Sequence, residues 1–171
     1  MLLLPALLRR WADGTAIPGG HRRIDIRLGL GAGAGTWLVL TATSVLQARI
    51  IGPHPQALTL IELTHPSPLN VVLELVVGSG LVPIAEELLF RAVLFAAFRQ
   101  RMAFWPAAII SSLLFGLVHG LDALAPIAVS GVCLAALYER RRSLGTNALA
   151  HGTLNLISTI VVYLVAAGRA G

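Results

Sequence analysis

Carboxylates, histidines and an amide stand inside stretches of apolar residues, and these are the side chains of the chain that could do chemistry. Glu86 and Glu87 are neighbours, and Arg91 follows Glu87 by four positions. On a helix, residues four apart lie on one face, so Arg91 can pair with Glu87 and hold it ionised. Glu86 points about 100° away from Glu87 around the helix axis, which leaves its carboxylate free to face a cavity. A buried ion pair that locks two helices together would explain Glu87 and Arg91, but it would not explain Glu86.

Two further stretches supply histidines at the same spacing. Phe115 precedes His119 by four positions, and His151 precedes Asn155 by four. A lone histidine in an apolar helix is more often a satisfied interior group than a functional one, but two of them with an amide and an unpaired glutamate favour a site. Such a set supplies a general base, proton carriers and hydrogen-bond donors for an oxyanion.

The order and spacing of these motifs resemble the CPBP family, the intramembrane proteases that include type II CAAX-processing and bacteriocin self-immunity (Abi-like) proteins. The resemblance covers roughly residues 69–157 and rests on three motifs: Glu86-Glu87-x-x-x-Arg91, Phe115-x-x-x-His119 and His151-x-x-x-Asn155. Two features depart from the family pattern: Ala92 stands where a glycine often follows the motif arginine, and the chain has fewer spans than the eight-helix members.

The resemblance implies a glutamate-dependent peptidase. Glu86, with His119, would activate the attacking water. His151 and Asn155 would donate hydrogen bonds to the oxyanion, and Glu87 would hold the geometry and charge of the site. Arg91 and Phe115 are its supporting residues. We therefore expect an intramembrane endopeptidase that cleaves a membrane-anchored protein or peptide substrate.

A zinc site made of Glu86, His119 and His151 is the alternative, because two histidines and a carboxylate can bind zinc. The chain has no His-Glu-x-x-His stretch, so such a site would need ligands from three separate helices. Asn155 is a poor zinc ligand but a good oxyanion donor. We expect a site without a metal or another cofactor.

The composition places these motifs in a membrane. Of 171 residues, 56% are hydrophobic and 12% are charged, whereas soluble domains carry about 25% charged residues. Lipid can solvate so much apolar surface directly. An ionisable group in a lipid-embedded segment costs about 2.5–3.5 kcal/mol and therefore usually has a function. Six such groups lie in or near the apolar segments: Glu74, Glu86, Glu87, Arg91, His119 and His151.

Five apolar segments are long enough to be candidate membrane spans: residues 28–46, 69–98, 104–119, 121–138 and 147–167. They predict an all-α, polytopic transmembrane helical bundle of about five spans, with a short N-terminal interfacial helix at residues 2–11. Gly78, Gly80 and Pro83 predict a kink or a break in the second segment. The proline-rich residues 52–68 predict a loop with one helical turn at 58–63. We expect a cytoplasmic or interfacial segment over residues 1–27 and one transmembrane protease domain over residues 28–171.

Arginine placement orients the predicted spans. All 13 basic residues are arginines and the net charge is +5, but they form short clusters between apolar segments, which does not favour a nucleic-acid partner. Ten arginines lie on one side of the predicted spans, and only Arg49 and Arg169 lie on the other. By the positive-inside rule, the N-terminus is cytoplasmic and the C-terminus external in a multi-pass protein of the cell membrane.

The depths of the candidate residues do not agree in this arrangement. At about 1.5 Å per residue, Glu86 and His119 lie roughly 18 and 22 Å from the cytoplasmic end, but His151 only about 8 Å. The fifth helix must therefore start earlier, tilt, or lie beside an aqueous cone open to the cytosol.

Other readings of the sequence fit less well. A rhomboid-like serine protease needs a Gly-x-Ser-Gly nucleophile, which Gly78-Ser79-Gly80 does not provide. Cys133 as a nucleophile has no adjacent base in the sequence. An intramembrane aspartyl protease needs two aspartates in spans, and only Asp122 lies near one. The alternative from another class is a non-catalytic membrane protein, such as a small transporter or an immunity or binding factor. Its intramembrane charges would form a proton relay.

Overall fold

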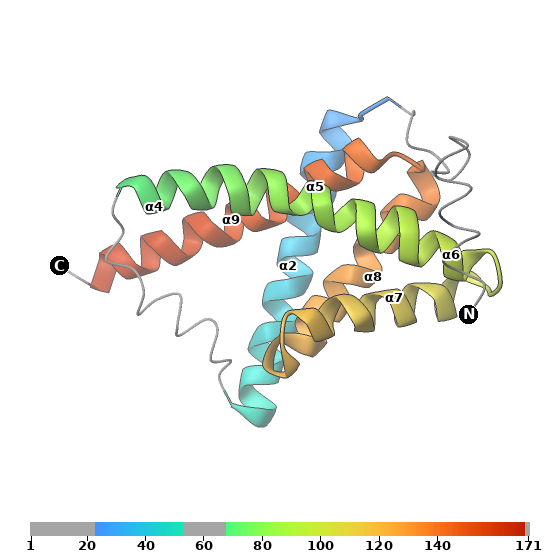
Figure 1. Ribbon diagram of the computed structural model, residues 1–171. Coiled ribbons are helices and arrows are strands. Elements are labelled where there is room, and N and C mark those ends of the chain that lie inside the picture. Colours follow the sequence, from blue (N-terminus) through green and yellow to red (C-terminus); the bar gives the residue numbers. More distant parts are fainter. Residues whose placement is uncertain (1–22, 53–67, 170–171) are drawn as a thin grey trace.

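The computed structural model describes residues 23–52 and 68–169, and within these ranges the chain forms helices and contains no strand (Figure 1). One long helix runs through α4 (Pro68–Leu73), η1 (Glu74–Leu81), α5 (Val82–Glu87), η2 (Leu88–Phe95) and α6 (Ala96–Arg99). The others are α2 (Ile26–Ile51), α7 (Phe104–Val118), the 3₁₀ turn η3 (Leu121–Ala123), α8 (Leu124–Arg141) and α9 (Leu144–Arg169). The predicted all-α membrane bundle is confirmed. The predicted interfacial helix at 2–11 and most of the predicted loop at 52–68 lie outside the described residues.

Each predicted apolar segment corresponds to one of these helices. Among the described residues, three helical stretches are long and apolar enough to cross a membrane: Ile26–Ile51, Leu121–Arg141 and Leu144–Val165. Helix α7 is apolar but shorter, with 15 residues, and it spans about 22 Å against a hydrocarbon core of about 30 Å. The long α4–α6 helix has the length to cross but changes its helical form along the way.

This long helix contains a change of form where the sequence predicts a kink or a break. The π-helical segments η1 and η2 stand on either side of α5, which contains Pro83 and the two adjacent glutamates. The chain does not break, but the helix changes direction near α5 (Figure 1). π-Helical turns widen the helix locally and occur frequently at functional sites.

Glycines bring α2 close to α9 where the two helices contact each other. A Cβ atom at Gly29 would lie 2.8 Å from Cδ2 of Leu149, and one at Gly33 would overlap the carbonyl oxygen of Ala150. Small residues of this kind let transmembrane helices approach closely, so that van der Waals contacts hold them together. This explains the glycine-rich start of the first predicted span.

Helices α7 and α8 form a hairpin closed by η3. The turn begins at Gly120, whose φ of 101° suits glycine. Gly131 of α8 lies against Ser112 of α7, where a Cβ would come within 2.9 Å of the serine Cβ. The hairpin packs on the end of the long helix through a core of buried residues: Phe95, Ala107, Ala108, Ala135 and Tyr138.

Helix α9 runs beside the first half of the long helix (Figure 1). It begins at Leu144, three residues before the start that the sequence predicts. Ser143 supports this early start, because its hydroxyl accepts a hydrogen bond from the backbone N–H of Thr146 (3.3 Å), as an N-terminal cap does. The early start adds about 4.5 Å to the depth of His151.

Candidate active site

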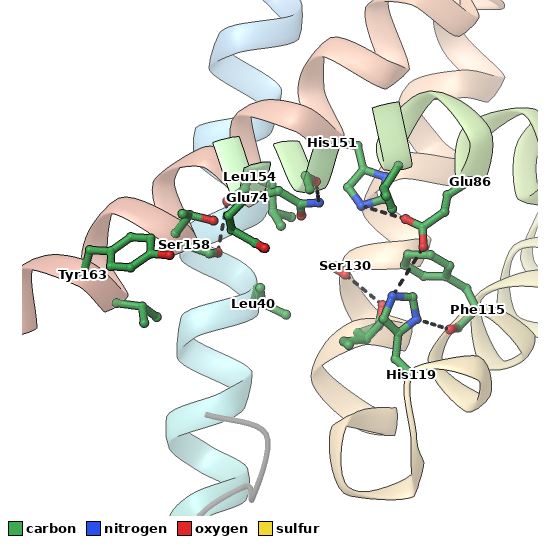
Figure 2. A pocket seen from close by; sticks show the side chains of 16 residues that line it. Leu40, Glu74, Glu86, Phe115, His119, Ser130, His151, Leu154, Ser158 and Tyr163 are labelled. Carbon is green, nitrogen blue, oxygen red and sulfur yellow. Dashed lines mark hydrogen bonds and ion pairs between the residues drawn. The ribbon is translucent and has the colours of Figure 1, made fainter. Parts of the chain in front are cut away.

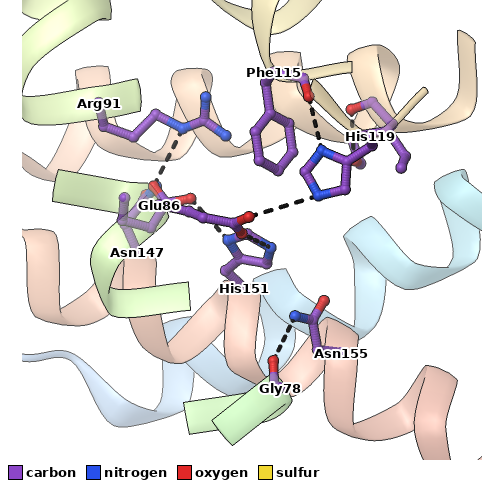
Figure 3. Close-up of polar contacts among 11 residues, drawn as sticks. Gly78, Glu86, Arg91, Phe115, His119, Asn147, His151 and Asn155 are labelled. Atoms are coloured by element: carbon purple, nitrogen blue, oxygen red, sulfur yellow. Dashed lines mark hydrogen bonds and ion pairs between the residues drawn. The ribbon is translucent and has the colours of Figure 1, made fainter. Parts of the chain in front are cut away.

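Glu86 lies between the two histidines that the sequence singles out (Figure 3). It comes from α5, His119 from the end of α7, and His151 from α9. Its Oε1 lies 3.6 Å from Nε2 of His119, and its Oε2 lies 3.5 Å from Nε2 of His151. The side chain of Glu86 remains 21% exposed. The depth mismatch is thus removed, since the three groups meet at one level of the bundle.

Each histidine is held by the ring nitrogen that faces away from Glu86. Nδ1 of His119 lies 2.8 Å from the carbonyl oxygen of Phe115. A carbonyl can only accept, so Nδ1 carries the hydrogen and Nε2 of His119 is the basic nitrogen. Nδ1 of His151 lies 3.0 Å from Oε1 of Glu87. Both rings therefore present Nε2 to the Glu86 carboxylate.

Glu87 is the buried anchor of the site, with an exposed fraction of 1%. Its carboxylate accepts hydrogen bonds from Nδ1 of His151 and from the amide of Asn147. Nε of Arg91, which is fully buried, lies 3.1 Å from Oε2 of Glu87. The predicted pair of Glu87 and Arg91 is therefore present, and Glu86 faces elsewhere, as the helical geometry predicts. Glu87 binds His151 in the way a carboxylate orients a histidine in a catalytic triad.

The ring of Phe115 packs against Arg91 and against both histidines. Its ring stands edge-on to His119 and His151, with centroids 4.7 and 5.7 Å away. The guanidinium carbon of Arg91 lies 5.2 Å from the same ring centroid, a distance at which a cation is attracted to an aromatic face. Phe115 thus fixes three charged or titratable side chains at once.

Asn155 lies one helical turn beyond His151 on α9. Its Nδ2 donates a hydrogen bond to the carbonyl oxygen of Gly78 in η1 (2.9 Å). A primary amide carries two N–H donors, so this bond orients the group and leaves the second N–H for another acceptor. Its predicted role as an oxyanion donor stays a prediction.

Five of these residues line a cavity of about 540 Å³ (Figure 2): Glu86, Phe115, His119, His151 and Asn155. Glu86, His119 and His151 gather toward one end of it. The remaining lining residues are mostly apolar or carry hydroxyl groups: Leu40, Glu74, Gly78, Val82, Ile127, Ser130, Leu154, Ser158, Thr159, Val162 and Tyr163. The cavity offers an elongated binding surface with Glu86 and the two histidines at one end.

The roles of Asn147 and Gly78 in the site were not predicted from the sequence. Asn147 binds Glu87 from α9, and Gly78 holds Asn155 through its backbone. A signal for Asn147 was present, because it precedes His151 by four positions just as His151 precedes Asn155. The role of Gly78 depends on the crossing of two distant helices and has no local signal.

The residues described do not form a cluster of metal ligands. Within residues 23–52 and 68–169, no group of three His, Cys, Asp or Glu side chains is arranged to hold a metal ion. The two Nε2 atoms face different oxygens of Glu86 rather than a common centre. The expectation of a metal-free site stays a prediction.

A family model described as "Type II CAAX prenyl endopeptidase Rce1-like" matches residues 68–157. The match covers more than half of the chain and includes the three motifs that carry Glu86, Glu87, Arg91, Phe115, His119, His151 and Asn155. The chain belongs to this Rce1-like family. The resemblance found in the three sequence motifs is thereby confirmed. Helix α2 lies outside the matched segment of this family member but packs against α9, which carries part of the site.

Two curated proteins are similar to this Rce1-like chain. The "Putative membrane peptidase YdiL" of Bacillus subtilis is 31% identical over 103 residues, which are 60% of this chain and 41% of YdiL. The "UPF0177 protein YxdF" of Lactococcus lactis is 32% identical over 87 residues, which are 50% of this chain and 48% of YxdF. The chain thus spans less than half the length of either relative along the aligned region. No solved structure matches the chain.

Proposed function

We propose that this protein is an intramembrane endopeptidase that cleaves membrane-anchored proteins or peptides with a water molecule activated by Glu86. The observation that carries the proposal is the position of Glu86. Its two carboxylate oxygens face the Nε2 atoms of two histidines at 3.5 and 3.6 Å, at the end of a cavity. Membership of the Rce1-like family and the similarity to YdiL support a membrane peptidase.

The reaction begins with proton abstraction. Glu86 and Nε2 of His119 are both acceptors, so a water between them donates one hydrogen to each and its oxygen becomes nucleophilic. The water oxygen then forms a bond to the carbonyl carbon of the substrate, and the water proton passes to Glu86. When the amide C–N bond breaks, the leaving nitrogen takes this proton. The products are a new carboxyl group and a new amine.

The oxyanion of the intermediate needs hydrogen-bond donors. His151 serves here as an imidazolium: its Nδ1–H donates to Glu87, and its Nε2, which lies 3.5 Å from Oε2 of Glu86 at the wall of the cavity, donates its hydrogen to the oxyanion. The second N–H of Asn155 is the other donor. Fixed donors in a site shielded from water stabilise a developing charge without reorganisation. Removing one such donor typically lowers the rate by about 10²–10³.

The buried pair of Glu87 and Arg91 keeps this arrangement charged and rigid. Glu87 stabilises the imidazolium of His151, and Arg91 balances the charge of Glu87.

The positions of the other charged groups support the proposed orientation of the protein in the membrane. Arg99 and Arg142 both bind Glu139, and Arg141 binds Asp25 at the start of α2. This end of the bundle, where α6 and α8 finish, is the proposed cytoplasmic side.

The proposal is tested by reconstituting the purified protein in liposomes together with a membrane-protein extract from cells that lack its gene. New protein termini are labelled and identified by mass spectrometry. The wild type should produce a reproducible set of new termini that Glu86→Gln does not produce. If the two proteins yield the same termini, the protease proposal fails, and a non-catalytic membrane protein becomes the better account.

A further inference from the structure

A second carboxylate, Glu74, lines the catalytic cavity and has no part in the proposed reaction. It is the first residue of η1 and is exposed in an otherwise apolar helix. It forms no hydrogen bond or ion pair with any residue of the described part of the chain. A carboxylate in an apolar, membrane-embedded helix is costly and usually functional. Since Glu74 has no structural partner there, a structural role does not explain it.

The carboxylate of Glu74 is directed toward the catalytic end of the cavity. It lies over Gly78, one turn further along, where a Cβ atom would come within 2.8 Å of its Oε1. The carbonyl of the same glycine accepts the hydrogen bond from Asn155. Figure 2 shows Glu74 beside Ser158, between Glu86 at one end and Tyr163 at the other. Glu74 and Glu86 therefore belong to one continuous binding surface.

The charges along this surface favour a cation. Glu74 and Glu86 are the two carboxylates that line the cavity, no arginine is among its described lining residues, and the chain has no lysine. Ser158, Thr159 and Tyr163 add hydroxyl groups to the lining, and Figure 2 shows Ser158 and Tyr163 on the side of Glu74. A guanidinium or ammonium group of the substrate would find there an unpaired carboxylate and neutral hydrogen-bond acceptors.

We propose that Glu74 is a specificity residue that binds a basic side chain of the substrate. This inference rests on the proposed protease function. The distance along the helix from the Glu74 carboxylate to Glu86 sets the position of this basic residue in the substrate. The Glu74 carboxylate lies over Gly78, and Gly78 and Glu86 are eight residues apart, or about 12 Å. An extended peptide covers about 3.3–3.6 Å per residue, so an arginine or lysine lies three or four residues from the cleaved bond, always on the same side.

The test compares the residues around each cleaved bond in the liposome experiment for the wild type, Glu74→Gln and Glu74→Arg. The wild type should enrich arginine and lysine at the third or fourth position on one side of the cut. Glu74→Gln should lose this enrichment, and Glu74→Arg should replace it with aspartate and glutamate. Asp122→Asn is the matched control, because it removes an exposed carboxylate that does not line the cavity. It should keep the wild-type pattern.

A synthetic peptide taken from one cleaved substrate then measures the effect. Replacing its basic residue with glutamine should lower kcat/KM about tenfold for the wild type, as expected for a charge-assisted hydrogen bond, and should leave Glu74→Gln unaffected. Unfolding temperatures of all variants should match the wild type, since Glu74 forms no hydrogen bond or ion pair with the described residues.

The outcomes separate the two proposals. New termini that depend on Glu86 but show no basic preference overturn the role of Glu74 and leave the protease intact. A basic preference that persists unchanged in Glu74→Gln has the same consequence. Absence of any Glu86-dependent terminus removes the protease proposal, and the inference on Glu74 with it.

Discussion

Replacing Glu87 with glutamine should unfold the protein at a much lower temperature, because Glu87 carries three contacts in a dry interior. Its carboxylate is 1% exposed and contacts Arg91, His151 and Asn147. Glutamine keeps one oxygen and adds an amide donor that faces the donors of Arg91 or Asn147. The fully buried guanidinium of Arg91 then lacks a counter-charge. Breaking a buried ion pair by removing one partner costs about 3–5 kcal/mol.

This cost converts into a measurable shift of the unfolding temperature. For a protein of this length, 1 kcal/mol corresponds to about 2–4 °C, so Glu87→Gln should lower the midpoint by roughly 6–20 °C. The assay is thermal unfolding in detergent, followed by tryptophan fluorescence, with wild type and variant at equal concentration. The chain has three tryptophans, and Trp105 lies on α7.

Glu86→Gln is the matched control for this measurement. Glu86 is adjacent in sequence but partly exposed, and its contacts with the histidines are 3.5 and 3.6 Å long. The Glu86→Gln substitution should shift the unfolding midpoint by less than about 3 °C, because it leaves no buried charge without a partner. Equal losses in both variants would refute the division of labour between the two glutamates, and Glu86 would then be a structural residue.

Three further predictions concern topology, metal dependence and helix packing. Reporter fusions after Arg101 and after Arg142 should read cytoplasmic and one at the C-terminus external; a cytoplasmic C-terminus would rule out five spans. Exhaustive chelation should leave proteolytic activity unchanged, and elemental analysis should find no stoichiometric zinc; recovery of a chelated enzyme by added zinc would instead make the histidines metal ligands. Gly33→Ala should lower the unfolding midpoint by several degrees because its Cβ overlaps the carbonyl of Ala150, whereas Gly31→Ala, with open space around it, should not; similar midpoints for the two variants would mean that α2 does not rely on this contact.

The helices and the division between the glutamates follow from local rules. A run of apolar residues long enough to span lipid predicts a helix, and a four-residue spacing predicts that Glu87 meets Arg91 on one face. The same geometry turns Glu86 away from Glu87, and it lines the cavity. These features depend only on nearby residues, so one sequence is sufficient to predict them.

The remaining features depend on contacts between distant segments. Asn147 binds Glu87 across 60 residues of sequence, and Asn155 binds the Gly78 backbone across 77. The start of α9 was misplaced because its first turn is polar, and apolar runs alone do not reveal a capping serine such as Ser143. Gly78, Gly80 and Pro83 predict a kink or a break in the long helix, but they do not predict the π-helical form of η1 and η2.

The catalytic role of Glu86 is the central claim, and the rate of peptide-bond cleavage tests it most directly. The wild type and Glu86→Gln are compared on one identified substrate peptide in liposomes. The assay temperature lies below the unfolding midpoint of both proteins. A positioned general base contributes about 10²–10⁴ to a rate. The account predicts that Glu86→Gln cleaves at least about 100-fold more slowly than the wild type while remaining folded. A folded Glu86→Gln variant that cleaves the peptide at the wild-type rate would contradict it.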